Sequence, residues 1–180
     1  MIIKKIIQIG NPILKQKTTP VKNIKTKKVQ QTIYDLVDSM KYHKLVGIAA
    51  PQISWKLRIF VTEIRKTPTR SPKSKDKLRI YINPEIIWKS PKQVILYEGC
   101  GSVAYGQLFG PVKRPEMVTV VAHEKNGKKF EIKADGLLSR VIQHEYDHLE
   151  GVEFTEKITD IRRIMSREEY IKRVKKTKVK

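Results

Sequence analysis

The segment His144-Glu145-Tyr146-Asp147-His148 places two histidines on one turn of a helix, with a glutamate directly after the first. Positions i and i+4 share a helix face, at about 5–6 Å between Cβ atoms, so both imidazoles can bind one metal ion. Glu145 is then placed to accept a proton from a water that the ion activates. The segment predicts hydrolytic metal chemistry, although a polar helix can spell the same pattern without a metal.

The residues around this segment predict a helix that packs against a core. Asp135 is a candidate N-cap and Gly151 a candidate C-terminal stop. Apolar residues recur at helical spacing before the first histidine: Leu137, Leu138, Val141 and Ile142. Two buried histidines and a buried glutamate cost free energy unless a charged partner compensates them, and a divalent cation is such a partner.

A hydrolytic site that keeps one position open for water needs a third protein ligand. Cys100 is the only cysteine, so it has no intramolecular disulfide partner, and its thiolate is a strong ligand for Zn(II) or Fe(II). A lone cysteine is ordinarily a small buried apolar side chain. The flanking Gly99 and Gly101 favour the ligand role, because they let the backbone approach a bound group closely.

Glu168 is the alternative third ligand, and it would make the chain a zinc peptidase. It follows His148 at a spacing that thermolysin-like enzymes use. However, residues 166–169, Ser-Arg-Glu-Glu, are typical of a capped helix start in a basic tail, which predicts that Glu168 is solvated.

A third segment, residues 46–52, reads Val-Gly-Ile-Ala-Ala-Pro-Gln and predicts tight backbone packing beneath a site, with Gln52 offering an NH2 donor. With residues 98–102, Glu-Gly-Cys-Gly-Ser, and the histidine segment, it resembles the peptide deformylase family. The family motifs read GxGxAAxQ, EGCxS and HExxH in that order, and one fixed position is missing here. Similarity extends between the motifs and covers roughly residues 5–155.

The resemblance implies an α+β fold, a strand-rich single domain of antiparallel sheets around a central metal-binding helix, with a C-terminal helix. It implies removal of the formyl group from formyl-methionyl nascent peptides. The implied metal ligands are Cys100, His144 and His148. The implied catalytic groups are Glu145 for proton transfer, and the Gln52 side chain and Gly101 N–H for the oxyanion. Glu98 and Arg114 are expected to pair and orient the cysteine loop.

The candidates for the methionine pocket are Val46, Gly47, Leu96, Leu137 and Val141. Many members of the family use Fe(II), and the donor set also suits Zn(II), Ni or Co. Three positions depart from the family pattern: Leu45 replaces a glycine, Gly101 a bulky apolar residue and Ala104 a proline. These departures concern substrate fit rather than the metal.

The chain has 180 residues and a formal net charge of +20, from 38 Lys+Arg against 18 Asp+Glu. We expect a catalytic domain over residues 1–158, with residues 159–180 as a basic helix or tail of the same domain. Such charge favours contact with the ribosome, or a nonenzymatic, RNA-associated protein with a structural metal. A structural site would need a fourth protein ligand and no base, so Glu145 argues against it.

The chain shows no secretory signal and no apolar run long enough to cross a membrane. With its single thiol, it is expected in the cytoplasm or another reducing compartment. The apolar pattern predicts one helix over residues 29–40 and a helix over residues 159–180 with an apolar stripe that includes Ile161 and Ile164. It predicts strands over residues 57–64, 78–82, 86–88, 94–97, 117–124 and 128–134, with a loop over residues 67–77.

Overall fold

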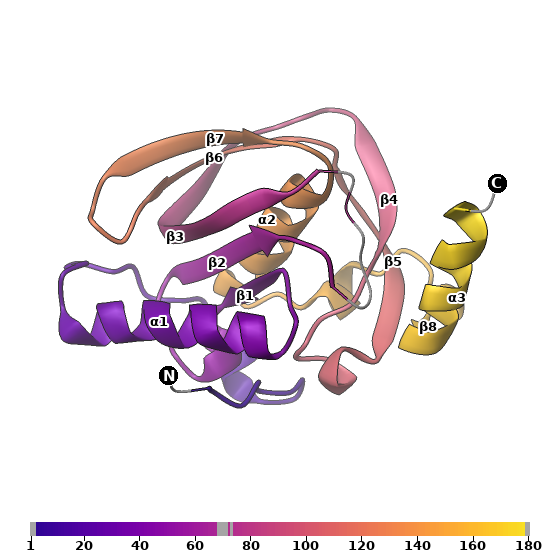
Figure 1. Cartoon of the computed structure of the whole chain (residues 1–180), viewed down its shortest axis with the longest axis horizontal. Coiled ribbons are helices and arrows are strands. Elements are labelled where there is room, and N and C mark those ends of the chain that lie inside the picture. The colour runs from indigo at the N-terminus through magenta and orange to yellow at the C-terminus, as the bar shows by residue number, and fades with distance from the viewer. Residues whose placement is uncertain (1–2, 68–71, 73, 179–180) are drawn as a thin grey trace.

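The computed structural model describes residues 3–67, 72 and 74–178 (Figure 1). Two antiparallel sheets make up the body of the chain. The larger sheet has the strand order β1 (Gly47–Ala49), β2 (Ile59–Ile64), β3 (Asp76–Lys89), β6 (Val118–His123), β7 (Lys129–Ala134). The smaller sheet has the order β4 (Gln93–Glu98), β5 (Leu108–Pro115), β8 (Met165–Ser166). The expected α+β class, with antiparallel sheets around one helix, is confirmed.

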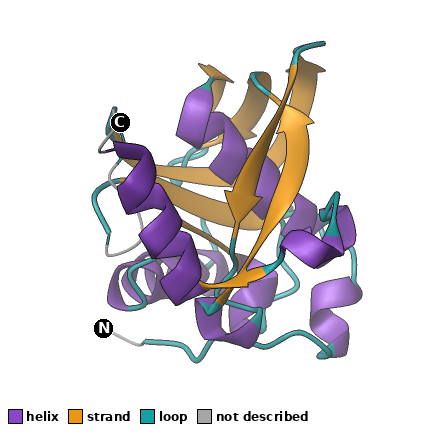
Figure 2. Cartoon of the chain, turned by 90° about the vertical axis from the view of Figure 1, so that its right-hand side faces the viewer, coloured by secondary structure: helices purple, strands orange, loops and turns teal. Residues whose placement is uncertain are grey.

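Three α-helices accompany the sheets in the described residues: α1 (Lys27–Tyr42), α2 (Gly136–Leu149) and α3 (Arg167–Lys178). Short 3-10 helices connect them: η1 (Pro12–Lys15), η2 (Ala50–Ile53), η3 (Ala104–Gly106), η4 (Phe154–Lys157) and η5 (Ile161–Arg163). Figure 2 views the molecule from the side that carries α3. No helix in the described part of the chain is both long and apolar enough to span a bilayer.

Successive side chains of β2 point to opposite faces of the larger sheet, and both faces are buried. Ile59 and Val61 join a core cluster with Leu36 of α1, whereas Phe60 joins a second cluster with Ile142 of α2. Helix α1 therefore covers one face and α2 the other, as Figure 1 shows. This arrangement places α2, which contains both histidines, in the centre of the molecule.

Helix α2 begins after Asp135, which stands at the N-cap although its side chain makes no capping hydrogen bond. The helix ends at the cap residue Glu150, directly before Gly151. On its buried side lie both histidines, Glu145 and Ile142. The position predicted for the metal helix is thus confirmed at both ends.

The strand predictions hold with two exceptions. Residues 78–82 and 86–88 belong to one strand, β3, whose register shifts between Ile82 and Glu85 and again between Ile86 and Trp88. Strand β5 was not predicted, because it contains a glycine and two prolines, which are depleted in strands. Of the loop predicted over residues 67–77, residues 68–71 and 73 lie outside the described residues, and β3 begins at Asp76.

The helix predicted over residues 159–180 is wrong in its first part. Residues 161–163 form η5, and residues 165–166 pair with β5 through Phe109↔Met165 and Leu108↔Ser166. Ile161 is 74% exposed, so it belongs to no packed stripe. Strand pairing with β5 takes the backbone hydrogen bonds of this segment, and a helix forms only from Arg167 onward.

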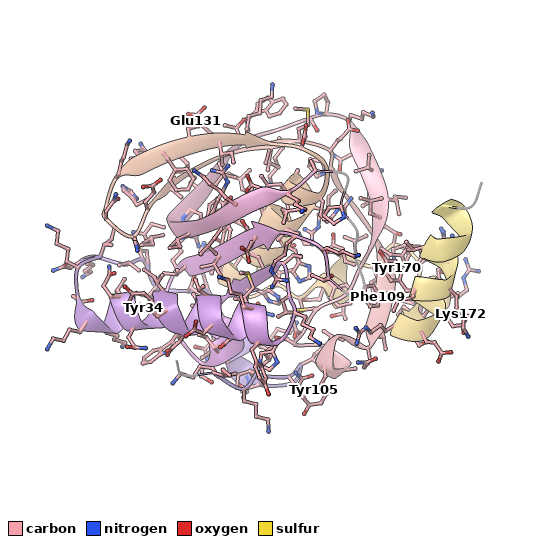
Figure 3. The ribbon with its side chains drawn as sticks, viewed as in Figure 1. Tyr34, Tyr105, Phe109, Glu131, Tyr170 and Lys172 are labelled. Carbon is pink, nitrogen blue, oxygen red and sulfur yellow. The ribbon has the colours of Figure 1, made fainter. Side chains whose placement is uncertain are left out.

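Helix α3 docks on β5 through an aromatic stack. The rings of Phe109 and Tyr170 lie 4.2 Å apart between centroids at an interplanar angle of 7°, and Tyr97 lies 6.2 Å from Tyr170. Figure 3 shows Phe109 and Tyr170 side by side, while Lys172 points away from the body. The stack fixes the start of α3 beside the strand that follows the Cys100 loop.

We expect Tyr170→Ala to lower the free energy of unfolding by about 1–2 kcal/mol, because it removes the stack and its buried ring surface. Urea unfolding measures this change. Ile161→Ala, at an exposed apolar position of the same segment, should cost less than about 0.5 kcal/mol. Equal costs for the two variants would show that the stack does not hold α3 in place.

Candidate active site

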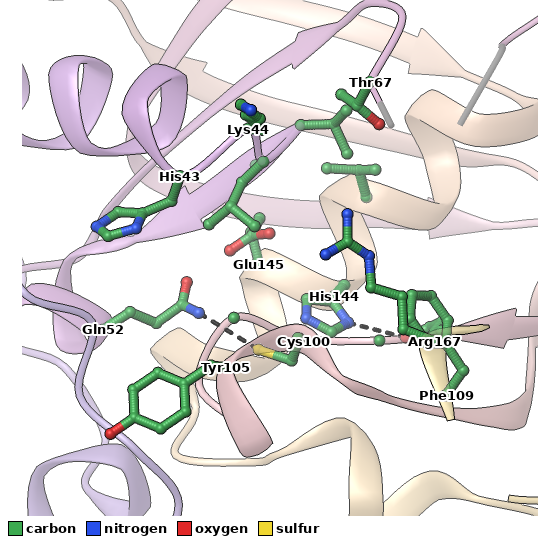
Figure 4. Close-up of a pocket in the computed structure, with 18 of the residues that line it drawn as sticks. His43, Lys44, Gln52, Thr67, Cys100, Tyr105, Phe109, His144, Glu145 and Arg167 are labelled. Carbon is green, nitrogen blue, oxygen red and sulfur yellow. Dashed lines mark hydrogen bonds and ion pairs between the residues drawn. The ribbon is translucent and has the colours of Figure 1, made fainter. Parts of the chain in front are cut away.

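A cavity of about 240 Å³ opens where α2, β1 and the loop after β4 meet. Figure 4 shows Gln52, Cys100, His144 and Glu145 around it. These side chains come from segments far apart in the sequence, and all four are buried. The three motifs identified in the sequence therefore meet at one place.

Cys100, His144 and His148 form a compact group of metal-binding atoms. One donor atom from each lies within 4.8 Å of the other two, and Cys100 Sγ is 3.2 Å from His148 Nε2. A tetrahedral Zn(II) site with its usual bond lengths separates such atoms by roughly 3.4–3.6 Å. The donor set and its spacing fit a single divalent ion. Within the described residues, no further histidine or carboxylate joins these three side chains as a fourth ligand.

Glu98 ties one of these ligands to the smaller sheet. His144 Nδ1 lies 2.9 Å from Glu98 Oε2, which leaves Nε2 of His144 free to face a metal. Arg114 donates to both oxygens of Glu98, at 2.7 and 2.9 Å. Burial raises the pKa of Glu98, but the hydrogen bonds from Arg114 and His144 outweigh it and hold that pKa well below its usual range. Glu98 is therefore a carboxylate that orients the imidazole.

Two further members of this network did not follow from the sequence. Arg140 donates to Glu98 Oε1 at 2.9 Å, and Arg114 also donates to Asp147 Oδ2 at 2.6 Å. Arg140 lies one helical turn before His144, and that position on a helix with buried histidines is the signal that could have identified it. Charge that would be costly to bury alone is thus shared among five side chains.

Gln52 points its amide at the cysteine loop. Ala49 N–H donates to Gln52 Oε1 at 2.8 Å, which turns the NH2 group toward the cavity. From there Nε2 donates to Cys100 Sγ at 3.3 Å and to Ser102 Oγ at 3.1 Å. Ser102 N–H also donates to Cys100 Sγ, at 3.4 Å. The expected NH2 donor is in place, and Ser102 is a partner for which the sequence alone gave no role.

Glu145 is buried beneath β1, and Gly47 provides the space that it occupies. A Cβ on Gly47 would lie 2.6 Å from Glu145 Oε1 and 2.6 Å from Val141 Cγ1. Glu145 Oε2 has no hydrogen-bond partner among the described residues. Burial raises the pKa of Glu145 to about 7, a value that suits a group exchanging protons near neutral pH. The small residue in the first motif is therefore a steric requirement of the glutamate in the third.

His148 is fully enclosed in protein. Burial, with a further contribution from His144, lowers its pKa well below the usual range, so the imidazole is neutral. Neutral imidazole is the form that binds a metal ion. Its Nδ1 has no partner among the described side and main chains.

The candidate pocket residues divide into three groups. Val46, Gly47 and Val141 line the cavity, and Leu137 packs behind Val46 and Val141. Leu96 does not line the cavity and is 46% exposed. It lies in the middle of β4, where the small sheet at the edge of the molecule is not covered by a helix.

Two of the departures from the family pattern are neighbours in space. A Cβ on Gly101 would lie 3.3 Å from Leu45 Cδ1 and 3.1 Å from Ile6 Cδ1. The Leu45 side chain thus occupies space beside the position that lacks a side chain. Ala104 has φ +46°, a conformation that the proline ring cannot adopt. Its replacement of proline follows from the turn that this loop makes.

Glu168 lies away from the cavity. Its side chain is 77% exposed and pairs with Lys172 at 2.9 Å. Ser166 Oγ accepts a hydrogen bond from Glu169 N–H at 3.3 Å, as expected for a capped helix start. The structure therefore offers Glu168 no part in a metal site, and the zinc peptidase alternative loses its third ligand.

Residues 3–164 match the family model for polypeptide deformylase. The chain is 41% identical to a peptide deformylase of Dictyoglomus turgidum, over 83% of this chain and 89% of that protein. It is 37% identical to a peptide deformylase of Pseudothermotoga lettingae, over 97% and 94% of the two chains.

Among solved structures, a Met-Ala-Ser-bound class I type b peptide deformylase from Acinetobacter baumannii superposes with a TM-score of 0.83 at 31% identity. That match covers 87% of this chain and 99% of the other. Sequence and fold agree with the geometry of the cavity, where three metal-binding donors meet a buried glutamate. The chain belongs to the polypeptide deformylase family, metal-dependent enzymes that remove the formyl group from nascent peptides.

Proposed function

We propose that Cys100, His144 and His148 hold one divalent ion, Fe(II) or Zn(II) with Ni or Co as further fits, while formyl-methionyl peptides are hydrolysed. The observation that supports this most is the buried group of three donor atoms within 4.8 Å of one another, without a fourth protein ligand in the described residues. An ion in this position supplies Lewis acidity, which activates water and polarises the formyl carbonyl.

Glu145 accepts the proton of the attacking water and later delivers it to the departing amine. Its unpartnered Oε2 and its position beneath Gly47 leave one oxygen available for this exchange. Burial keeps bulk water from competing for the proton, and the raised pKa matches the task near neutral pH. Glu145 would be further favoured in its base form by the positive charge of an ion held by the three ligands, because that charge would lower the pKa of the carboxyl.

The Gln52 amide and the Gly101 N–H stabilise the negative charge that develops on the formyl oxygen. Gln52 already has its NH2 group directed at Cys100, at 3.3 Å, so the donor needs little reorganisation. Val46 and Val141, supported by Leu137, form the apolar wall for the methionine side chain. The free cysteine Cys100 lines the cavity, where an oxidant that enters could reach its sulfur, and we place the protein in the cytoplasm or another reducing compartment for that reason.

Glu145→Gln tests the proton-transfer role. The amide cannot accept a proton at neutral pH, so release of formate from a formyl-Met-Ala-Ser peptide should fall by about 10²- to 10⁴-fold. The metal content should stay at the wild-type level, because Glu145 is not among the proposed ligands. The measurements are a formate assay and metal analysis of the same anaerobic preparation. Turnover at the wild-type rate would remove Glu145 from the mechanism.

The variants Cys100→Ala and Glu168→Ala test which residue is the third metal ligand, and so distinguish the ligand set of a deformylase from that of a zinc peptidase. Loss of the Cys100 sulfur should abolish or strongly weaken metal binding, because only two protein ligands remain. Glu168→Ala should leave both metal content and formate release close to wild type, since that carboxylate is exposed. Anaerobic metal titration measures both variants. The opposite pattern would favour Glu168 as the ligand.

We further propose that the basic residues of α3 and the chain end contact the ribosome, beside the emerging nascent peptide. The segment 172–180 has six basic residues and no acidic one. Lys172 points away from the body, where it pairs with the exposed Glu168 and Glu169, and a phosphate would compete with these two carboxylates for it. Removal of residues 160–180 is not a clean test, because this deletion also takes away β8 and the aromatic stack on β5.

A charge variant replaces the deletion as the test. Lys172, Lys175, Lys176 and Lys178 are changed together to Gln, and the control changes exposed Lys22, Lys25, Lys27 and Lys125 to Gln. Both variants lose the same charge, but only the first should weaken co-sedimentation with ribosomes at low salt and flatten its salt dependence. Cleavage of a short peptide should stay unchanged in both. Equal effects on co-sedimentation would mean that only net charge matters.

A further inference from the structure

The catalytic cavity has a wall that comes from the C-terminal helix. Arg167, the first residue of α3, lines the cavity together with Phe109 and Glu145. Figure 4 shows the Arg167 guanidinium extending over the cavity on the side of His144. The basic C-terminal segment thus reaches the site of the reaction as well as the surface.

The position of Arg167 is fixed by its backbone neighbours. Its N–H donates to Gln107 O at 2.8 Å, directly after the β5–β8 pairs. One turn later, Tyr170 stacks on Phe109, and Arg173 Nη1 donates to the Tyr97 hydroxyl at 3.0 Å. Three contacts, one to the residue before β5 and two to β5 and β4, hold the start of α3, so the Arg167 side chain is presented to the cavity in a defined place.

The charges around the cavity leave Arg167 without a carboxylate partner. Glu98 is occupied by Arg114, Arg140 and His144. No ion pair joins Arg167 or the neighbouring cavity residue Lys44 to any carboxylate in the described part of the chain. Glu98 and Glu145 are the carboxylates that line the cavity, and Glu98 is already paired, so Lys44 and Arg167 are the cations left to face an incoming peptide.

We infer that Arg167 binds a carboxylate of the peptide close after the formyl-methionine and makes the enzyme prefer acidic substrates. This inference rests on the proposed function of the cavity. A guanidinium offers paired N–H donors that match a carboxylate, and partial exclusion of water strengthens the contact. The carboxylate can belong to an Asp or Glu side chain or to the C-terminus of a short peptide, and the two sources are separable by amidation.

The experiment compares matched substrates. Formyl-Met-Glu-Ser-amide and formyl-Met-Ala-Glu-amide are each paired with their Gln counterpart, and formyl-Met-Ala-Ser with its amide. For wild type, we expect kcat/KM to be about fivefold higher for the acidic member of at least one pair. Arg167→Gln should bring that ratio close to one, because it lowers kcat/KM for the acidic member of the pair about fivefold more than for the neutral member.

Arg163→Gln is the matched control, because it removes the same charge from the same segment outside the cavity. It should keep the wild-type ratio. Thermal unfolding checks that both variants are folded. The inference is overturned if wild type shows no preference for the acidic peptide of any pair. It is also overturned if Arg167→Gln keeps the preference, or if Arg163→Gln removes it to the same extent. An equal loss for acidic and neutral peptides would also overturn it, since Arg167 would then bind the peptide backbone.

A binding measurement separates this inference from the proposed function. The deformylated products of all three pairs are titrated into the metal-loaded protein by calorimetry. If no formyl peptide is hydrolysed, the proposed function fails, and the ratios of the dissociation constants within the pairs still decide the role of Arg167. A ratio that favours the acidic product of at least one pair and vanishes in Arg167→Gln supports the inference, and ratios near one for all three pairs in wild type refute it.

Discussion

The buried carboxylate of Glu98 is the interaction on which the site depends. It lies at the end of β4 and accepts hydrogen bonds from Arg114 of β5 and from Arg140 and His144 of α2. One side chain therefore joins the smaller sheet to the central helix and orients a metal ligand. Loss of Glu98 would remove the carboxylate that the buried Arg114 and Arg140 share and leave Asp147 as the carboxylate partner of Arg114, which is more costly than the loss of an exposed ion pair. The same contacts that stabilise the interior also shape the reaction site.

Close packing on the other side of α2 places the catalytic carboxylate. Gly47 gives β1 no side chain at the point where Glu145 passes beneath it. Gln52, in the 3-10 helix that follows β1, has its amide turned by the Ala49 N–H toward Cys100. The first motif thus acts through its backbone as much as through side chains. Its small residues are explained by the approach of β1 and η2 to the helix.

The C-terminal segment combines two environments. Strand β8 and the Phe109–Tyr170 stack bind it to β5, while Lys172 remains in solvent. A basic tail is read from sequence as a solvated or nucleic-acid-binding face. In this structure Arg167, one of the basic residues of this tail, lines the cavity instead. Substrate selection and partner contact can therefore be altered separately, by changes at the start or at the end of α3.

The sequence by itself determined the class of fold and the chemistry of the site. The helical spacing of His144 and His148 and the strands predicted over residues 117–124 and 128–134 are local patterns, and local patterns follow from backbone periodicity. The histidine segment also identified Glu145, whereas the resemblance to the deformylase family implied the Glu98–Arg114 pair and the role of Gln52 toward the oxyanion. Glu145, Gln52 and Glu98 line one cavity in the structure, and Arg114 pairs with Glu98.

Tertiary structure decided what depends on contacts between distant segments. Leu96 was expected in the methionine pocket because it is apolar, but its side chain is 46% exposed and does not line the cavity, since the packing of distant segments decides which residues of β4 are covered. Residues 159–166 have the apolar spacing of a helix. Residues 165–166 nevertheless pair with β5, and a helix forms only from Arg167 onward. Arg140 and Arg167 became part of the site because long-range packing, which no local pattern encodes, brings their chain segments together.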